Sequence, residues 1–172
     1  IAKYPVLVNA KGNAVNAANS APWFEPGVTE CGPEEMREYV LRGGGFLALH
    51  AALSIGANSL PVYSEMVGCY FMNHPLREMT HVEVTERNAI TQNVNAFSER
   101  DEHYQIAVTA QDAKPFLMTR SEHGGSFVSG YTRPYGKGRV AALSPGHTLS
   151  VWENPNFQLL LKNTIRWCAG KL

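Results

Sequence analysis

Two apolar stretches, each followed closely by a histidine, constrain the fold of this chain more than any other feature. In "GGGFLALHA" a short apolar strand leads directly to His50. In "GRVAALSPGH" a similar strand leads to His147. Runs that are apolar on both faces are typical of the buried strands of a parallel sheet. Ligands of such sheets bind at the carboxyl ends of the strands, and we expect both imidazoles there.

The rest of the chain alternates between strand and helix patterns. "YPVLVNA" predicts another buried strand, and "GPEEMREYVLRGGG" predicts a helix with Pro33 in its first turn and a stop at Gly43. A last helix is expected from Pro155, capped by Asn154, with apolar residues at helical spacing. This alternation predicts a three-layer α/β sandwich with a mostly parallel sheet and some antiparallel additions. The chain of 172 residues suits one domain, residues 1–172.

The middle of the chain is less regular. "VYSEMVGCYFMNHP" predicts a short helix followed by an irregular segment, and "THVEVTE" predicts a strand with one solvated face. "AITQNVNAFSERDEHYQIAVTA" predicts a turn or short helix, an acidic loop and then a strand from about Gln105. "KPFLMTRSE" and "SFVSGYTRPYGKGRVAALSPGH" supply further strands.

Composition excludes several classes of function. The 15 acidic and 15 basic residues balance, and no basic run indicates a nucleic-acid partner. No apolar stretch is long enough to span a bilayer, so no membrane partner is expected. The three cysteines form no C-x-x-C pair, and cysteine chemistry is not expected to be the function. The sequence indicates a soluble protein and leaves its compartment open, with the cytoplasm slightly favoured over export.

Four stretches occur in the order found in one known family: "YVLRGGGFLALHAA", "VGCYFMNHP", "AITQNVNAFSERDEHY" and "YGKGRVAALSPGHTLSVWENPNFQLLLKNTIRWCAG". On these stretches the chain resembles the ThuA-like domains, named for trehalose utilisation, within the class I glutamine amidotransferase-like superfamily. The resemblance implies a flavodoxin-like sheet flanked by helices. It also implies that His50 stands where the amidotransferases carry a cysteine nucleophile, and His147 where they carry its partner histidine. Because a neutral imidazole is a poor substitute for a thiolate, glutaminase activity is not expected.

The family's recurrent polar positions extend the candidate site to His74 in "NHP" and Glu102 in "DEHY". With His50 and His147 they form a suitable ligand set for one divalent metal ion, zinc or a similar one. The fold has to assemble this site, because none of the local spacings is a metal signature. No nucleotide cofactor is expected, since the glycine triplet Gly43–Gly45 precedes a strand, whereas a phosphate-binding loop opens a helix.

The resemblance also suggests individual roles. Catalytic roles are expected for His50, Glu102 and His147. Substrate contacts are expected for His74, Asp101 and Tyr104. Structural alternatives stay open: Asp101 as a cap or turn former, Tyr104 as a core aromatic, and each histidine, taken alone, as a structural side chain. Trp23 and Trp152 are candidates for stacking on a sugar ring, although burial is the commoner fate of a tryptophan.

Two departures from the family bear on these expectations. The family's "HPIT"-like segment is "NAIT" here, with Asn88 and Ala89 in place of histidine and proline. The family's domain also opens with a strand and a helix before the equivalent of "YPVLVNA", and a sheet without that central strand would expose two hydrogen-bonding edges. We therefore expect either an N-terminally incomplete domain or a variant completed by another chain. This leaves a homo-oligomer or a companion chain open.

The function implied by the resemblance is carbohydrate catabolism. The partner would be a small-molecule carbohydrate, either a di- or oligosaccharide or its keto derivative. Elimination, isomerisation and hydrolysis are all compatible with a histidine–carboxylate site that holds a metal ion. The alternative is a non-catalytic sugar-binding, regulatory or accessory domain of trehalose-type sugar utilisation.

Overall fold

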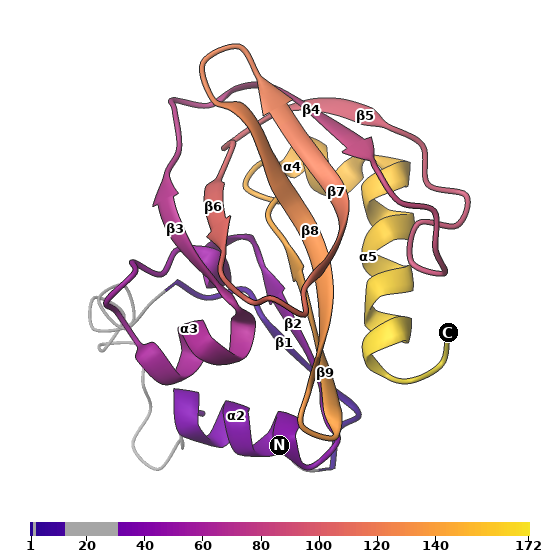
Figure 1. Ribbon diagram of the computed structural model, residues 1–172. Helices are drawn as coiled ribbons and strands as arrows, with labels where there is room; N and C mark the ends of the chain where they lie inside the picture. Colours follow the sequence, from indigo (N-terminus) through magenta and orange to yellow (C-terminus); the bar gives the residue numbers. More distant parts are fainter. Residues whose placement is uncertain (2, 13–30) are drawn as a thin grey trace.

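The computed structural model describes residues 1, 3–12 and 31–172, so Trp23 lies outside the described part (Figure 1). The strands are β1 (Val6–Asn9), β2 (Gly45–Leu49), β3 (Cys69–Asn73), β4 (Glu78–Val84), β5 (Phe97–Asp101), β6 (Gln105–Val108), β7 (Lys114–Ser121), β8 (Gly125–Tyr135) and β9 (Gly138–Leu143). The helices are α2 (Pro33–Leu41), the 3-10 helix η2 (His50–Leu53), α3 (Pro61–Val67), α4 (Leu149–Glu153) and α5 (Pro155–Cys168).

Seven strands form one sheet in the order β1-β2-β9-β8-β7-β4-β5, and β3 pairs with β6 in a separate two-stranded sheet. Among the described strands of this sheet, only β1, β2 and β9 are parallel, and every pairing from β9 to β5 is antiparallel. The α/β class is confirmed, the expected mostly parallel sheet is wrong, and a flavodoxin-like arrangement is not confirmed. The connections explain the difference, because β7–β8 and β8–β9 are joined by tight turns, whereas parallel pairing needs a long crossover.

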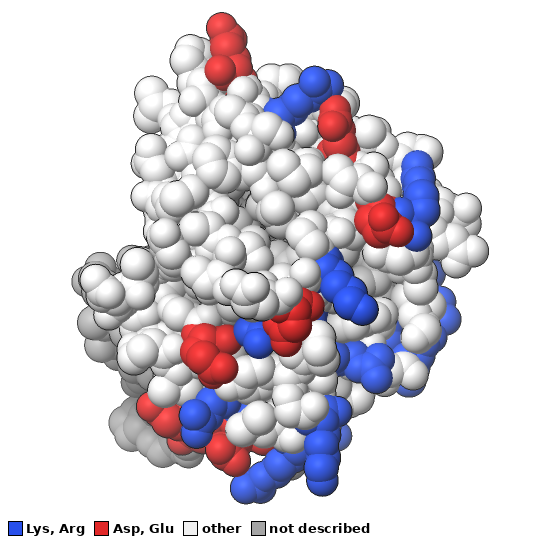
Figure 2. Space-filling view, viewed as in Figure 1, with Lys and Arg blue, Asp and Glu red and all other residues white. Residues whose placement is uncertain are grey.

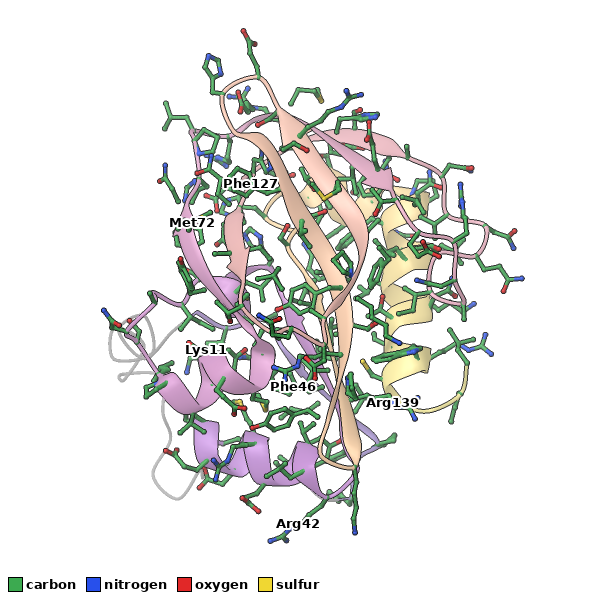
Figure 3. All side chains as sticks on the ribbon, viewed as in Figure 1. Lys11, Arg42, Phe46, Met72, Phe127 and Arg139 are labelled. Atoms are coloured by element: carbon green, nitrogen blue, oxygen red, sulfur yellow. The ribbon has the colours of Figure 1, made fainter. Side chains whose placement is uncertain are left out.

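Helices cover both faces of the parallel part of the sheet. Figure 1 shows α2 and α3 on one side and α5 on the other. Phe46, labelled in Figure 3, belongs to the core on the α2–α3 side and meets Tyr63 of α3 edge to face. Leu47, the next residue, belongs to the core on the α5 side with Phe157. Every residue of β2 is buried, because the strand lies between two neighbouring strands and two helical layers.

The helix boundaries expected for α2 and α5 are confirmed. The α2 helix begins at Pro33, and the chain turns away from it at Gly43, whose φ is 115°. Glycine adopts this left-handed backbone at helix ends without steric cost. The α5 helix begins at Pro155, and the side chain of Asn154 caps its first turn.

Three segments differ from expectation. β5 occupies the stretch expected as an acidic loop; it is an edge strand, where polar side chains such as Ser98 and Arg100 face solvent. β3 replaces the irregular segment expected after α3, and it pairs with β6 outside the main sheet. The short helix α4, directly after His147 and Thr148, was not expected at all.

Charged side chains of both signs are interspersed on the face that Figure 2 shows, mainly around α2 and the lower half of the molecule. The surface over β3 and β6 carries few of them on this face. No helix in the described part of the chain combines the length and apolar character needed to cross a membrane.

Candidate functional site

His50 occupies a strained turn at the carboxyl end of β2. Leu49 still has extended backbone angles, but His50 has a φ of 44° and opens the 3-10 helix η2. This left-handed conformation is uncommon for a residue with a side chain and costs about 1–2 kcal/mol. Strain of this kind persists where the surrounding structure enforces it, and it clusters at functional sites. The turn holds a mostly buried imidazole, 7% exposed, at the edge of the sheet.

The orientation of the His50 ring follows from one hydrogen bond. Its Nδ1 lies 2.8 Å from the carbonyl oxygen of Ser144, at the end of the neighbouring strand β9. A carbonyl only accepts, so Nδ1 carries the hydrogen and the neutral ring keeps a lone pair on Nε2. Burial lowers the pKa of His50 and outweighs the opposing effects of the Ser144 carbonyl and nearby carboxylates. The neutral ring is the form that binds a metal ion.

Asp101 shapes the loop that carries His147. Its carboxylate is 1% exposed and accepts three backbone hydrogen bonds, from the N–H groups of Gly146, His147 and Thr148, at 2.9, 2.9 and 3.1 Å. The three N–H groups precede helix α4, so Asp101 holds the loop in front of the helix and has a structural role there. All three hydrogen bonds are charge-assisted and buried or partly buried, so they fix the path of the loop beside His50.

Glu102 joins the histidines. Its Oε2 lies 3.2 Å from His147 Nδ1 and 3.6 Å from His50 Nε2, and the two nitrogens are 3.3 Å apart. Among the described residues, these three make the one group of histidine, cysteine or acidic side chains that could hold a metal ion. An ion that binds three atoms tetrahedrally at about 2.1 Å holds them about 3.4 Å apart. The three separations therefore match the ligand spacing of one ion.

His74 lies beside this group, and its side chain is about a third exposed. Its Nδ1 is 2.8 Å from the Pro75 carbonyl oxygen, so the hydrogen is on Nδ1 and the neutral ring presents Nε2 as an acceptor. That Nε2 is 3.9 Å from Glu102 Oε2, farther than either of the other two histidine nitrogens. His74 is thus brought to the site expected from the sequence, but it stands outside the compact three-atom group.

Tyr104 forms the aromatic wall of the site. Its ring stacks on His50 with centroids 4.4 Å apart, and on His74 at 5.6 Å. The residue is buried, and burial, followed by the charges of Glu102 and Asp101, raises its pKa to about 12. The phenol therefore stays protonated at neutral pH and orients the two imidazoles through stacking.

Of the remaining histidines, His103 is buried against Ser121, with Nδ1 2.6 Å from the serine Oγ. His81 contacts Ser98 and Glu83, and His123 pairs with Glu78. None of the three belongs to the three-ligand group.

Sequence reasoning missed the parts of the site that are backbone. The Ser144 carbonyl orients His50, and the N–H groups from Gly146 to Thr148 receive Asp101. Main-chain groups leave no residue-type signal. The glycine at position 146, whose φ is 138°, was the only hint of a special loop.

The chain matches a known protein family over most of its length. Residues 21–168 match the family model of ThuA, described as trehalose utilisation. Among curated proteins, none matches this chain.

Several of the solved structures that resemble the chain show what it shares with them. A ThuA-like protein from Bacteroides uniformis ATCC 8492 is 20% identical with a TM-score of 0.73, over 96% of this chain and 69% of that one. A ThuA-like protein from Parabacteroides merdae ATCC 43184 is 16% identical with a TM-score of 0.73, over 99% and 72%. The β-galactosidase from Rahnella sp. R3 is 15% identical with a TM-score of 0.61, over 81% of this chain but 21% of its own. At such identities the likeness shows a shared fold.

Proposed function

Because the chain belongs to the ThuA family, described as trehalose utilisation, we propose that residues 1–172 act as one domain that processes a sugar at a metal centre. His50 Nε2, His147 Nδ1 and Glu102 Oε2 hold one divalent ion there. The observation that carries the proposal is the set of ligand-atom separations, 3.2, 3.3 and 3.6 Å, across residues from three distant parts of the chain.

The surroundings of the three ligand atoms support a binding site for an ion. His50 donates its other ring N–H to a backbone carbonyl, as metal-bound histidines ordinarily do. Two histidines and a carboxylate suit zinc, and also the iron and manganese sites that keep open positions. His147 is about a third exposed at its side chain, which gives an ion and a substrate a way in from solvent.

The substrate we propose is a di- or oligosaccharide or its keto derivative. A bound divalent ion supplies a Lewis acid for a carbonyl or hydroxyl oxygen. His74 Nε2, outside the ligand group, accepts a proton from the substrate or from water and returns it to the leaving oxygen, a transfer that contributes about 10²–10⁴-fold. On a keto sugar, removal of the proton beside the carbonyl is followed by expulsion of the glycosidic oxygen from the next carbon. On an unmodified sugar the same groups serve isomerisation or hydrolysis.

The turn at His50 supports the relation to the glutamine amidotransferases that the sequence suggests. A strained strand-to-helix turn is also the setting of a nucleophile elbow. Here the residue at the turn is an imidazole, and the buried thiols of Cys69 and Cys168 have pKa values raised by burial to about 11 and about 12. Glutamine hydrolysis through a thiolate is therefore not part of the proposal.

A second candidate is a non-catalytic sugar-binding or accessory domain. One observation favours it: the fold of this chain occurs in the β-galactosidase from Rahnella sp. R3 as a small part, 21%, of a longer chain. The two candidates differ in turnover, since an accessory domain binds sugar without converting it.

The test is the metal content of the purified protein beside its variants. We expect about one divalent ion per chain in the wild type and in His81→Ala, and a loss of most of it in His50→Ala and His147→Ala. His81 is the matched control because it lies outside the ligand group. Full retention of metal in both site variants would remove these histidines from the ligand set. Incubation with trehalose and with a keto derivative of trehalose then separates enzyme from accessory domain by product formation.

A further inference from the structure

The short helix α4 exposes two apolar side chains beside the candidate metal centre. Leu149 is 70% exposed and Trp152 is 39% exposed. They are three residues apart, so they lie next to each other on one face of the helix. The helix follows His147 with only Thr148 between them. Neither apolar side chain has a part in the metal centre.

Trp152 is held in a fixed position next to the histidines. Its Nε1 donates a 2.8 Å hydrogen bond to the carbonyl of Gly146, the residue before His147. Its ring meets the buried Phe157 edge to face, with centroids 5.5 Å apart. An indole tied at one edge and supported by another ring has little freedom, so the side it turns to solvent is preorganised for contact.

Gly146 shows how close the indole lies to the metal centre. A Cβ added at this glycine would be 3.5 Å from His50 Cβ and 3.9 Å from Trp152 Cζ2. His50 and Trp152 therefore flank the same backbone position, one on the side of β2 and the other on the side of α4.

We propose that Trp152, extended by Leu149, is the stacking platform for one pyranose ring of a disaccharide whose other ring lies at the histidine–glutamate centre. This inference rests on the sugar-processing function proposed above. The face of a pyranose that carries axial C–H groups is apolar and packs on an aromatic ring, while its hydroxyl groups stay hydrated. Hydroxyl groups lie nearby in the sequence, since Thr148, directly before the helix, and Ser150, in its first turn, have their side-chain oxygens 3.1 Å apart.

A second copy of the chain is the weaker occupant for this platform. A standard protein interface buries about 800 Å² on each partner. Two side chains on a helix of five residues supply only a fraction of that area. The adjoining surface is the polar cluster of His147 and Glu102, which suits a hydroxylated ligand better than an apolar interface core.

The experiment is calorimetric titration of the metal-loaded protein with α,α-trehalose, and with sorbitol as an acyclic polyol that lacks a ring face. The variants are Trp152→Leu, which keeps an apolar side chain without the ring, and Trp152→Phe, which keeps a ring. The matched control is Trp167→Phe in α5, whose ring packs under the guanidinium of Arg139, labelled in Figure 3. Metal content, circular dichroism and sedimentation are recorded for every variant.

We expect trehalose to bind the wild type and Trp167→Phe alike, Trp152→Leu about five- to tenfold more weakly, and Trp152→Phe in between, with sorbitol bound by none. Metal content stays unchanged throughout.

Equal affinity of Trp152→Leu and wild type for trehalose overturns the proposed stacking platform. Absence of trehalose binding by a metal-loaded wild type also overturns it, while the metal centre stands. A wild-type dimer that Trp152→Leu dissociates overturns it in favour of a second copy. Loss of metal from the wild type on purification, by contrast, counts against the proposed function itself.

Discussion

His50 Nε2 lies 3.3 Å from His147 Nδ1, although the two residues are 97 positions apart in the chain. The parallel pairing of β2 with β9 causes this approach, because it sets Leu49 opposite Leu143 and ends both strands at one edge of the sheet. The Ser144 carbonyl at the end of β9 then orients the His50 ring. Two neighbouring strands thus supply both histidines and the group that fixes one of them.

The backbone at His50 gives the first prediction. His50→Ala and His50→Gly remove the same imidazole, but only glycine adopts a φ of 44° without strain. We expect the glycine variant to be more stable than the alanine variant by about 1 kcal/mol in urea unfolding. The control is Ala51→Gly, at a residue with negative φ, which should lower stability by about 0.5–1 kcal/mol. An alanine variant as stable as the glycine variant would contradict the strained turn.

The hydrogen bonds of Asp101 give the second prediction. Asp101→Ala leaves three backbone N–H groups without their acceptor, and each costs about 1–3 kcal/mol when it stays buried. We expect a loss of at least about 3 kcal/mol and a metal affinity reduced at least tenfold, because the loop that carries His147 loosens. Asp112→Asn is the matched control; its ion pair with Arg133 is more exposed, and its loss should cost at most about 1 kcal/mol. An Asp101→Ala protein with wild-type stability would show that the loop does not depend on this carboxylate.

The pair of Glu78 and His123 gives a prediction on pH. Hydrogen bonds from Ser121 and His123 lower the pKa of Glu78 to about 2, and the bond to Glu78 raises the pKa of His123. The Glu78 contribution is present above its unfolded pKa, about 4.5, and is lost as pH falls toward 2. The His123 contribution is present below about 6.5 and is lost as pH rises through its folded pKa. The pair therefore stabilises the fold most between about pH 4.5 and 6.5.

This pH window can be measured by comparing the melting temperatures of wild type and His123→Ala from pH 3 to pH 9. The difference should be largest inside the window and shrink on both sides of it. An NMR titration of the His123 ring should give a pKa above about 6.5. A difference in melting temperature that does not change with pH would show that the pair contributes nothing.

The thiols give the fourth prediction. Burial raises the pKa of Cys69 to about 11 and of Cys168 to about 12. Burial and the charge of Glu35 also raise the pKa of Cys31, but this thiol is only partly buried and reagents can reach it. Because the thiolate is the reactive form, iodoacetamide at pH 8 should modify Cys31 in the folded protein and leave the other two until urea is added. Mass spectrometry of the labelled peptides shows which cysteines are modified. Fast labelling of Cys69 under native conditions would show that this thiol is reactive, and would contradict the exclusion of a thiolate mechanism.

Much of the parallel half of the fold could be predicted from the sequence. β2 and β9 are apolar on both faces because neighbours bury both faces, and the ends of α5 carry local signals in Asn154 and Pro155. The antiparallel half could not be predicted as well. β5 contains Ser98, Glu99 and Arg100, which read as a loop until the edge position of the strand is known.

The candidate site was predictable to a similar extent. His50 and His147 follow from their strands, but the distance of Glu102 from them depends on where β5 ends in three dimensions. The contacts of Asp101 could not be predicted for a different reason. Its partners are backbone N–H groups, which every residue except proline has, so no sequence pattern distinguishes them.

The most direct test of the proposed metal centre is crystallographic. Crystals of the protein are soaked in turn with zinc, manganese and ferrous iron, and anomalous scattering is recorded at each metal edge. We expect one anomalous peak bound by His50 Nε2, His147 Nδ1 and a Glu102 carboxylate oxygen, each at about 2.0–2.2 Å. A peak only at surface residues such as His81 and Glu83, or none with any of the three metals, would contradict it.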